Sequence, residues 1–194
     1  MRLIALADCR TMPWKNGGGS TTAIAVHPQG ASLDDFDWRI STAHVGTDGP
    51  FSTFPDIDRT LAVLTGEGIA LAFGDGETVR LDPDSPPCAF AGDRIVEGRL
   101  VGGPIDDLNV MTRRGRWRHS VRRLAGSGPI SVAPAGDLMV LVARSAGWTI
   151  ASGDRREHPG AGDSVVLERL EHAVLSSDGA GEIFAAHLWA EGSG

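Results

Sequence analysis

The feature that most constrains the fold is the absence of a helical period. Many short apolar and β-branched runs are separated by Gly and Pro turns, and none keeps a 3.6-residue spacing over three turns. We therefore expect an all-β protein with little helix. The central stretch, 38–66, contains two strand-like runs, 38–45 and 58–64, which we expect to form a hairpin. Further strands are predicted at 2–7, 21–26, 68–73, 77–81, 95–101 and 107–112.

Three short blocks of sequence occur twice in the same order, which indicates two related β units. The blocks at 61–64, 68–75 and 91–100 recur at 138–141, 147–154 and 161–170. Each unit would close a sheet and so remove its exposed edges. We expect a first unit at 1–124, which includes the N-terminal strands, and a second, smaller unit at 125–194. We expect the two to pack together as one compact body.

Charge and hydropathy restrict the function classes. The formal net charge of −7 argues against general binding to nucleic acids or anionic membranes. No apolar run approaches the roughly 20 residues of a membrane span, and the N-terminus has the pattern of a strand rather than of a signal peptide. Cys9 and Cys88 form no CxxC pair, which fits a reducing cytoplasm, although a disulfide between them stays open.

The histidine pattern does not predict a metal site. A divalent cation needs three or four converging His, Asp or Glu side chains. None of the six histidines forms an H-x-H or H-x-x-x-H pair. The triple glycine that ends at Gly19 is not followed by Lys-Ser or Lys-Thr, so it is no phosphate loop. We expect no metal and no other cofactor.

Four separated motifs resemble those of the HutD/Ves family. They are W-K-N-G at 14–17, W-R-I-S-T-A at 38–43, G-P-F-S-T-F-P-D-I-D-R at 49–59 and D-L-N-V-M-T-R at 107–113. The resemblance implies a bicupin, two cupin-like β-barrels or sandwiches in one chain, and a role as a regulator that senses an intermediate of histidine breakdown. The Pro55-Asp56 pair departs from the usual Pro-Gly, and Asp tolerates left-handed backbone better than most residues.

Strand alternation brings the polar residues of these motifs onto shared faces. The shared faces hold Arg39 with Ser41, Arg59 with Leu61 and Val63, and Asn109 with Met111 and Arg113. A guanidinium at position 59, buried among aliphatic side chains, would cost several kcal/mol unless an anion pairs with it. That anion is either an internal carboxylate, from Asp58, Asp106 or Asp107, or the carboxylate of a ligand held in a bidentate fork.

The other candidates also have two interpretations. Asn109 either contacts a ligand or stabilises the start of a strand. The aromatic side chains either wall a pocket or belong to the core, and they are Trp14, Trp38, Phe51 and Phe54. Lys15, the only lysine, either contributes a charge to the site or lies on the surface. The expected ligand-binding set is Arg59, Arg39, Asn109, Lys15, Ser41, Ser52, Arg113, Trp38 and Phe54. No catalytic residue is predicted, because no nucleophile elbow or Asp–His dyad is evident.

The leading hypothesis is a non-enzymatic, metal-free regulator that binds a small carboxylate, with urocanate, formylglutamate and formate as the ligands to test. One alternative is a cupin enzyme, an isomerase or hydrolase, acting on such a carboxylate. Another is a protein-interaction module that uses the arginine run at 113–123. That run alternates like an exposed strand face in an acidic chain, which argues against direct nucleic-acid binding. Whether the chain forms a homodimer stays open.

Overall fold

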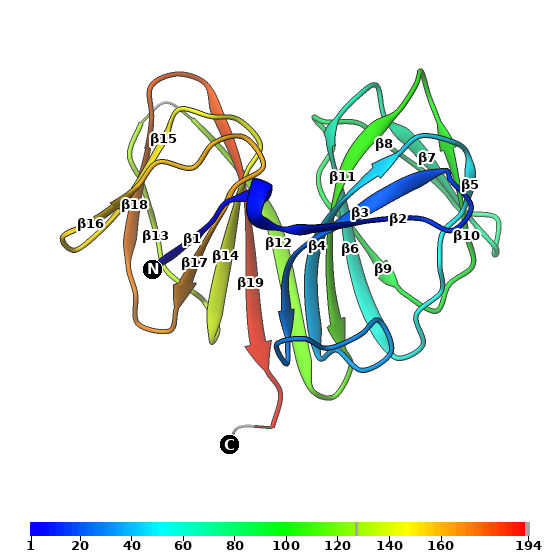
Figure 1. Cartoon of the computed structure of the whole chain (residues 1–194), viewed down its shortest axis with the longest axis horizontal. Helices are drawn as coiled ribbons and strands as arrows, with labels where there is room; N and C mark the ends of the chain where they lie inside the picture. Colours follow the sequence, from blue (N-terminus) through cyan, green and yellow to red (C-terminus); the bar gives the residue numbers. More distant parts are fainter. Residues whose placement is uncertain (127, 193–194) are drawn as a thin grey trace. The chain divides into compact units, whose positions relative to one another are not determined.

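The computed structural model describes residues 1–126 and 128–192 and is built almost entirely from strands (Figure 1). Within these residues the helical structure is one 3₁₀ turn, η1 (Leu6–Asp8), so the prediction of an all-β fold is confirmed. None of the described segments is a helix long and apolar enough to cross a membrane.

The chain divides into two compact units. The N-terminal unit is Arg10–Arg116, and the C-terminal unit combines Met1–Cys9 with the chain from Trp117 onward. These bounds differ from the expected 1–124 and 125–194. The first nine residues join the second unit because β1 (Arg2–Ile4) pairs with β17 (Ser164–Glu168).

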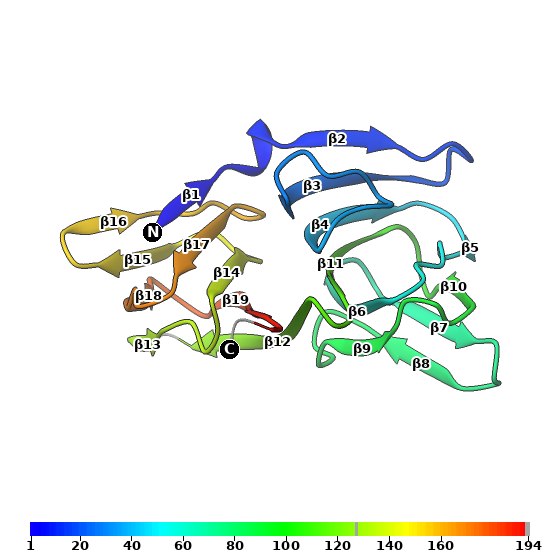
Figure 2. The same cartoon turned by 90° about the horizontal axis from the view of Figure 1, so that it is seen from below.

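The N-terminal unit is made of two antiparallel sheets around a common interior (Figure 2). The six-stranded sheet has the order β2 (Arg10–Pro13), β3 (Gly19–His27), β4 (Trp38–Val45), β11 (Ile105–Arg113), β6 (Ile57–Thr65) and β9 (Cys88–Ala91). The four-stranded sheet has the order β5 (Gly49–Pro50), β10 (Val96–Leu100), β7 (Ile69–Phe73) and β8 (Thr78–Leu81). Leu61 and Val63 from the first sheet pack with Ile69 and Leu71 from the second.

The expected hairpin is wrong. Strands β4 and β6 do not pair, because β11 lies between them and pairs with both. The connection at 46–56 is too long for a tight hairpin turn, and it carries β5 into the other sheet. The strand that completes the central pairing therefore comes from 105–113, far along the chain.

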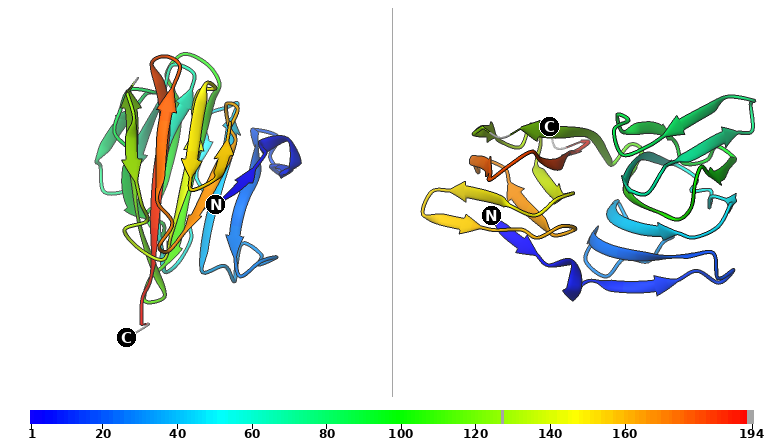
Figure 3. Two further views of the ribbon diagram at one scale, coloured as in Figure 1. Left: turned by 90° about the vertical axis from the view of Figure 1, so that its left-hand side faces the viewer. Right: turned by 90° about the horizontal axis from the view of Figure 1, so that it is seen from above.

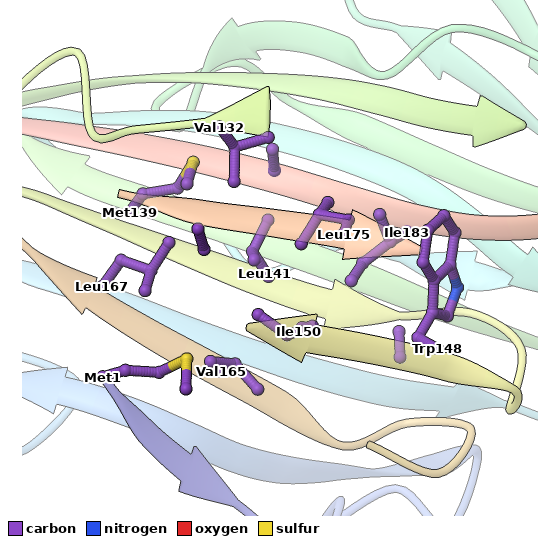
Figure 4. Packing of buried hydrophobic residues seen from close by; sticks show 13 residues of the cluster. Met1, Val132, Met139, Leu141, Trp148, Ile150, Val165, Leu167, Leu175 and Ile183 are labelled. Carbon is purple, nitrogen blue, oxygen red and sulfur yellow. The ribbon is translucent and has the colours of Figure 1, made fainter. Parts of the chain in front are cut away.

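The C-terminal unit also has two antiparallel sheets. One has the order β1, β17, β14 (Leu138–Ala143), β19 (Gly181–Ala190) and β12 (Trp117–Gly126). The other has the order β13 (Ile130–Val132), β18 (Ala173–Ser177), β15 (Trp148–Ser152) and β16 (Arg155–Glu157). Figure 3 shows the N-terminal segment beside the strands of this unit. Its core is apolar, with Trp148 and Leu141 fully buried (Figure 4).

The two units repeat the same strand connectivity. Strand β6 lies between β9 and β11 as β14 lies between β17 and β19, and β7 pairs with β8 and β10 as β15 pairs with β16 and β18. In the block at 68–75 and its copy at 147–154, equivalent positions point to the same side of their sheets. The block at 61–64 is offset by one residue, since Leu61 points inward in β6 but Met139 does so in β14. The block at 91–100 contains β10, and its copy at 161–170 contains β17. In the strand order β17 corresponds to β9 and not to β10, so this match does not join equivalent strands.

Candidate functional site

The inner face of the six-stranded sheet carries polar residues in the middle of the N-terminal unit. Cross-strand register on β4, β11 and β6 arranges three rows: Arg39–Met111–Arg59, Ser41–Asn109–Leu61 and Ala43–Asp107–Val63. These rows face inward, because Leu61 and Val63 belong to the core shared with the other sheet. The predicted shared faces are confirmed. We call the following residues, all buried, the inner polar cluster: Arg39, Ser41, Arg59, Asp107 and Asn109.

Arg59 is held by an amide and by two aromatic rings. Its side chain is inside the unit, with the residue 7% exposed. Nε donates a hydrogen bond of 2.8 Å to Oδ1 of Asn109, and Nη2 donates to the same oxygen. The guanidinium carbon lies 4.8 Å from the centre of the Phe51 ring and 5.5 Å from that of Phe90, a cation–π arrangement. Burial lowers the pKa of Arg59 to about 10, so the group keeps its charge at neutral pH.

No aspartate forms a direct ion pair with Arg59 among the residues that the structure describes. Asp58 instead pairs with Arg114 at 2.8 Å. Asp106 accepts hydrogen bonds from His44 at 2.9 Å and from Thr65 at 2.8 Å. The internal salt bridge considered from the sequence is therefore not formed through direct contact.

Asp107 reaches Arg59 only through Asn109. Nδ2 of Asn109 donates to Oδ1 of Asp107, while the amide oxygen accepts from Arg59. Oδ2 of Asp107 is fully buried and has no hydrogen-bond partner. Burial raises the pKa of Asp107 to about 7, against the opposing field of Arg59. From the sequence Asp107 is expected only as a salt-bridge partner, although its spacing of two from Asn109 puts both residues on one face.

The side chain of Arg39 makes no hydrogen bond or ion pair with any described residue, although the residue is buried and only 6% exposed. Arg39 and Arg59 lie on the strands on either side of Met111. Their backbones are two strand spacings apart, which is about 10 Å. Oδ2 of Asp107 is a fully buried atom without a hydrogen-bond partner, whereas no nitrogen of either arginine is. Each arginine nitrogen is therefore either hydrogen-bonded or not fully buried. The cluster thus holds two cations against one acid and keeps N–H donors available to an anion.

The remaining expected site residues divide into two groups. Ser41 lies in the inner polar cluster, next to Asn109. Phe54 packs edge-on against Phe36, with ring centres 6.4 Å apart, in the apolar cluster that includes Met111. That cluster lies next to the inner polar cluster, because Met111 stands between Arg39 and Arg59 in the strand register.

The other four residues are not brought into the cluster. Lys15 and Ser52 are exposed. Trp38 stacks on His27, with ring centres 5.9 Å apart, and strand alternation puts it on the face opposite to Arg39. Arg113 donates hydrogen bonds of 3.0 Å to the carbonyl oxygens of Asp34 and Phe36, so its donors hold a loop in place.

The loop before β6 brings Phe51 to Arg59. Asp56 adopts left-handed backbone with φ of 60°, in agreement with the tolerance expected for Asp at this position. On the opposing sheet Gly98 leaves room for the ring, since a Cβ there would lie 2.5 Å from a carbon of Phe51. Phe51 was predicted only as a pocket wall or core residue, and its contact with Arg59 depends on this tertiary fit.

Several arginines of the 113–123 run are occupied by internal contacts. Arg114 forms ion pairs with Asp58 and Asp93, and Arg116 pairs with Asp37 at 2.8 Å. The guanidinium of Arg118 lies 4.5 Å from the ring centre of Trp189.

A surface pocket of the C-terminal unit, lined in part by Ser131, His172 and Val174, contains neither of the buried arginines.

The fold and the site define a class: a chain of two cupin-like β-sandwich units. A cupin 2 conserved barrel domain protein from Leptotrichia buccalis shares this fold, with a TM-score of 0.60 and 8% identity, over 95% of this chain and 99% of that one. The chain belongs to the HutD family, whose model matches residues 6–185.

Three further proteins to which the chain is similar come from Pseudomonas species. An uncharacterised 21.2 kDa protein in the hutC 3′ region of Pseudomonas putida is 37% identical over 127 residues, which span 66% of this chain and 66% of that protein. A conserved protein of unknown function from Pseudomonas aeruginosa PAO1 has a TM-score of 0.89 and 32% identity, covering 97% and 98% of the two chains. HutD from Pseudomonas fluorescens SBW25, solved in a formate condition, has a TM-score of 0.81 and 28% identity, covering 98% and 99%.

The inner polar cluster does not fit the divalent metal that many cupins hold. It offers one carboxylate and one amide beside two guanidinium cations, which would repel a metal ion. Across the described residues, no group of three or more His, Cys, Asp or Glu side chains is placed to hold a metal. The chemistry of the cluster favours an anion instead.

Proposed function

We propose that the N-terminal unit binds a small carboxylate through Arg39 and Arg59, and that the protein is a cytoplasmic, non-enzymatic regulator of histidine utilisation. One observation carries this proposal: two buried guanidinium groups share the interior with a single acid, which neither contacts directly. An arriving carboxylate would provide the missing negative charge.

The energetics favour such a ligand. A hydrogen bond to a charged partner contributes about 1.5–3 kcal/mol, and arginine presents two parallel N–H groups to a carboxylate. Arg39 has all its donors available, and Arg59 retains Nη1, since Nε and Nη2 are bonded to Asn109. The faces of Phe51 and Phe90 flank the guanidinium of Arg59, which would favour a flat ligand.

The relatives support the choice of ligands. The HutD structure from P. fluorescens was obtained in a formate condition, and formate is the smallest carboxylate. The P. putida relative is encoded next to hutC, which fits a role in histidine utilisation. Formate, urocanate and N-formylglutamate are therefore the ligands to test first.

A thermal-shift series tests the proposal. A ligand at 100 times its Kd should add about 2.7 kcal/mol to the free energy of unfolding, which raises the Tm by several degrees at this chain length. Imidazole and the methyl ester of urocanate lack the carboxylate and should give no shift. The shift should disappear in Arg39→Met and Arg59→Met and persist in the surface control Arg116→Gln. An undiminished shift in both buried-arginine variants would rule out this site.

The chemical fate of the bound ligand distinguishes a regulator from an enzyme. Proton NMR of each bound carboxylate, incubated with stoichiometric protein, should show the compound unchanged after many hours. Conversion that is lost in Arg59→Met would instead support the isomerase or hydrolase alternative.

A further inference from the structure

Asp107 is shielded from solvent yet linked to the arginine that would contact the ligand. The residue is 1% exposed, and its Oδ2 atom is sealed and without a partner. Its Oδ1 accepts a hydrogen bond from Asn109, whose own oxygen accepts two from Arg59. A ligand on Arg59 therefore changes the electrostatic surroundings of Asp107 without contacting it.

We propose that carboxylate binding at Arg39 and Arg59 is coupled to uptake of a proton by Asp107. This inference rests on the proposed function and specifies how the same site responds to pH. The proton comes from bulk water or buffer and adds to a carboxylate oxygen of Asp107. The buried anion becomes a neutral acid, and no other covalent bond changes.

The coupling follows from the balance of charges. Burial raises the pKa of Asp107, and the positive charge of Arg59 lowers it, with a result of about 7. A carboxylate placed on Arg59 offsets the field of that arginine, so that burial prevails and the pKa of Asp107 rises further. Linkage is reciprocal, so protonation of Asp107 strengthens carboxylate binding by the same factor.

The groups around Asp107 leave few competing origins for a pH response. Asp106, the next residue on β11, is the other charged group that acts on it, and Asp106 also raises its pKa. On the neighbouring strands the register partners of Asp107 are Ala43 and Val63, neither of which titrates. His44 forms an ion pair with Asp106 when protonated, so these two residues provide the controls.

Calorimetry with N-formylglutamate measures the coupling, because its carboxylates stay ionised from pH 6 to 9. Titrations at pH 7 in phosphate and in Tris, which differ in ionisation enthalpy, give the number of protons taken up. For a rise of one unit in the pKa of Asp107, about 0.4 proton should be absorbed, and the Kd should weaken about eightfold from pH 6 to pH 9. The carboxyl ¹³C resonance of Asp107 should titrate at higher pH with ligand than without it.

Variants assign the proton to its residue. Asp107→Asn should still bind, with no proton uptake and a Kd that is nearly independent of pH. Asp106→Asn and His44→Gln should still take up a proton when the ligand binds, although loss of the Asp106 charge lowers the starting pKa of Asp107. Binding by the wild type without proton uptake, or uptake that survives in Asp107→Asn, would overturn the inference while leaving the carboxylate site intact. Absence of binding by the wild type would overturn the proposed function together with it. The wild-type proton count and the ¹³C titration decide the question even if Asp107→Asn fails to fold.

Discussion

The two units have the same strand order but different interiors. In the N-terminal unit, β6 and β11 turn Arg59, Asn109 and Asp107 inward. In the C-terminal unit, the inward-facing residues of the counterpart strands are Met139, Leu141, Ala143, Ile183, Ala185 and His187. The inner face of this sheet therefore carries charged side chains in the N-terminal unit, whereas in the C-terminal unit it is apolar apart from His187.

The single polar member of the second set shows how a buried group is made compatible with a core. Nδ1 of His187 accepts a hydrogen bond of 3.0 Å from the backbone N–H of Ala135. Burial lowers the pKa of His187, with a further contribution from Arg122, which favours the neutral ring. By contrast, Arg39 in the N-terminal unit has no such partner. This topology therefore does not require charged residues inside, and the buried charges of the N-terminal unit carry a desolvation cost that the C-terminal unit avoids.

The largest effect is expected when a charge is moved into the apolar interior. Leu141 is fully buried in the C-terminal core, so Leu141→Arg should lower the free energy of unfolding by at least about 3–5 kcal/mol, as for an uncompensated buried charge. Arg59→Met should change it by about 1 kcal/mol or less at pH 6, because a poorly compensated cation is removed and Asp107 can take up a proton. Urea unfolding measures both. Equal losses in the two variants would mean that the interiors do not differ in this respect.

A smaller effect should appear in the pH dependence of stability. The pKa of Asp107 in the folded protein is about 7, above the ordinary value of 3.8 for an aspartate. Between these values the folded state binds more protons than the unfolded state, so stability falls as pH rises through this window. Asp107→Asn lacks this contribution, so its stability relative to the wild type should improve by about 3–4 kcal/mol from pH 4 to pH 8.

Urea unfolding of Asp107→Asn and of the wild type at several pH values gives this difference directly. His187→Gln, in the other unit, serves as the comparison and should not change stability in the same direction. A difference between Asp107→Asn and the wild type that does not vary with pH would contradict the assignment of this behaviour to Asp107.

The smallest effect is expected at two residues with left-handed backbone conformation, one in each unit. Leu170 has φ of 76° and is 86% exposed, so Leu170→Gly should relieve strain and raise stability by about 0.5–1 kcal/mol. Asp56 has φ of 60°, and Asp56→Gly should change stability by less than about 0.5 kcal/mol, because Asp tolerates this conformation. Thermal unfolding of the two variants should rank them in that order, and the reverse order would show that the loop before β6 is the more strained.

Much of the site could be predicted from strand alternation. The shared faces of Arg39 with Ser41 and of Asn109 with Met111 need only the period of two. Phe51 and Asp107 could not be assigned in the same way, since their roles depend on a loop and on an amide that connects separate strands. The hairpin prediction was wrong because neighbouring strands in the sequence are not always neighbours in a sheet.

The sequence by itself determined the all-β class, most strand positions of the N-terminal unit and which side chains share a face, because these follow from local patterns. It also determined the family, through motifs spread along the chain. Only the tertiary structure decided that β11 lies between β4 and β6 and so brings Arg39, Asn109 and Arg59 together. The physical reason is that strand pairing satisfies the hydrogen bonds and buries the apolar faces of all strands at once, and no single segment carries that information.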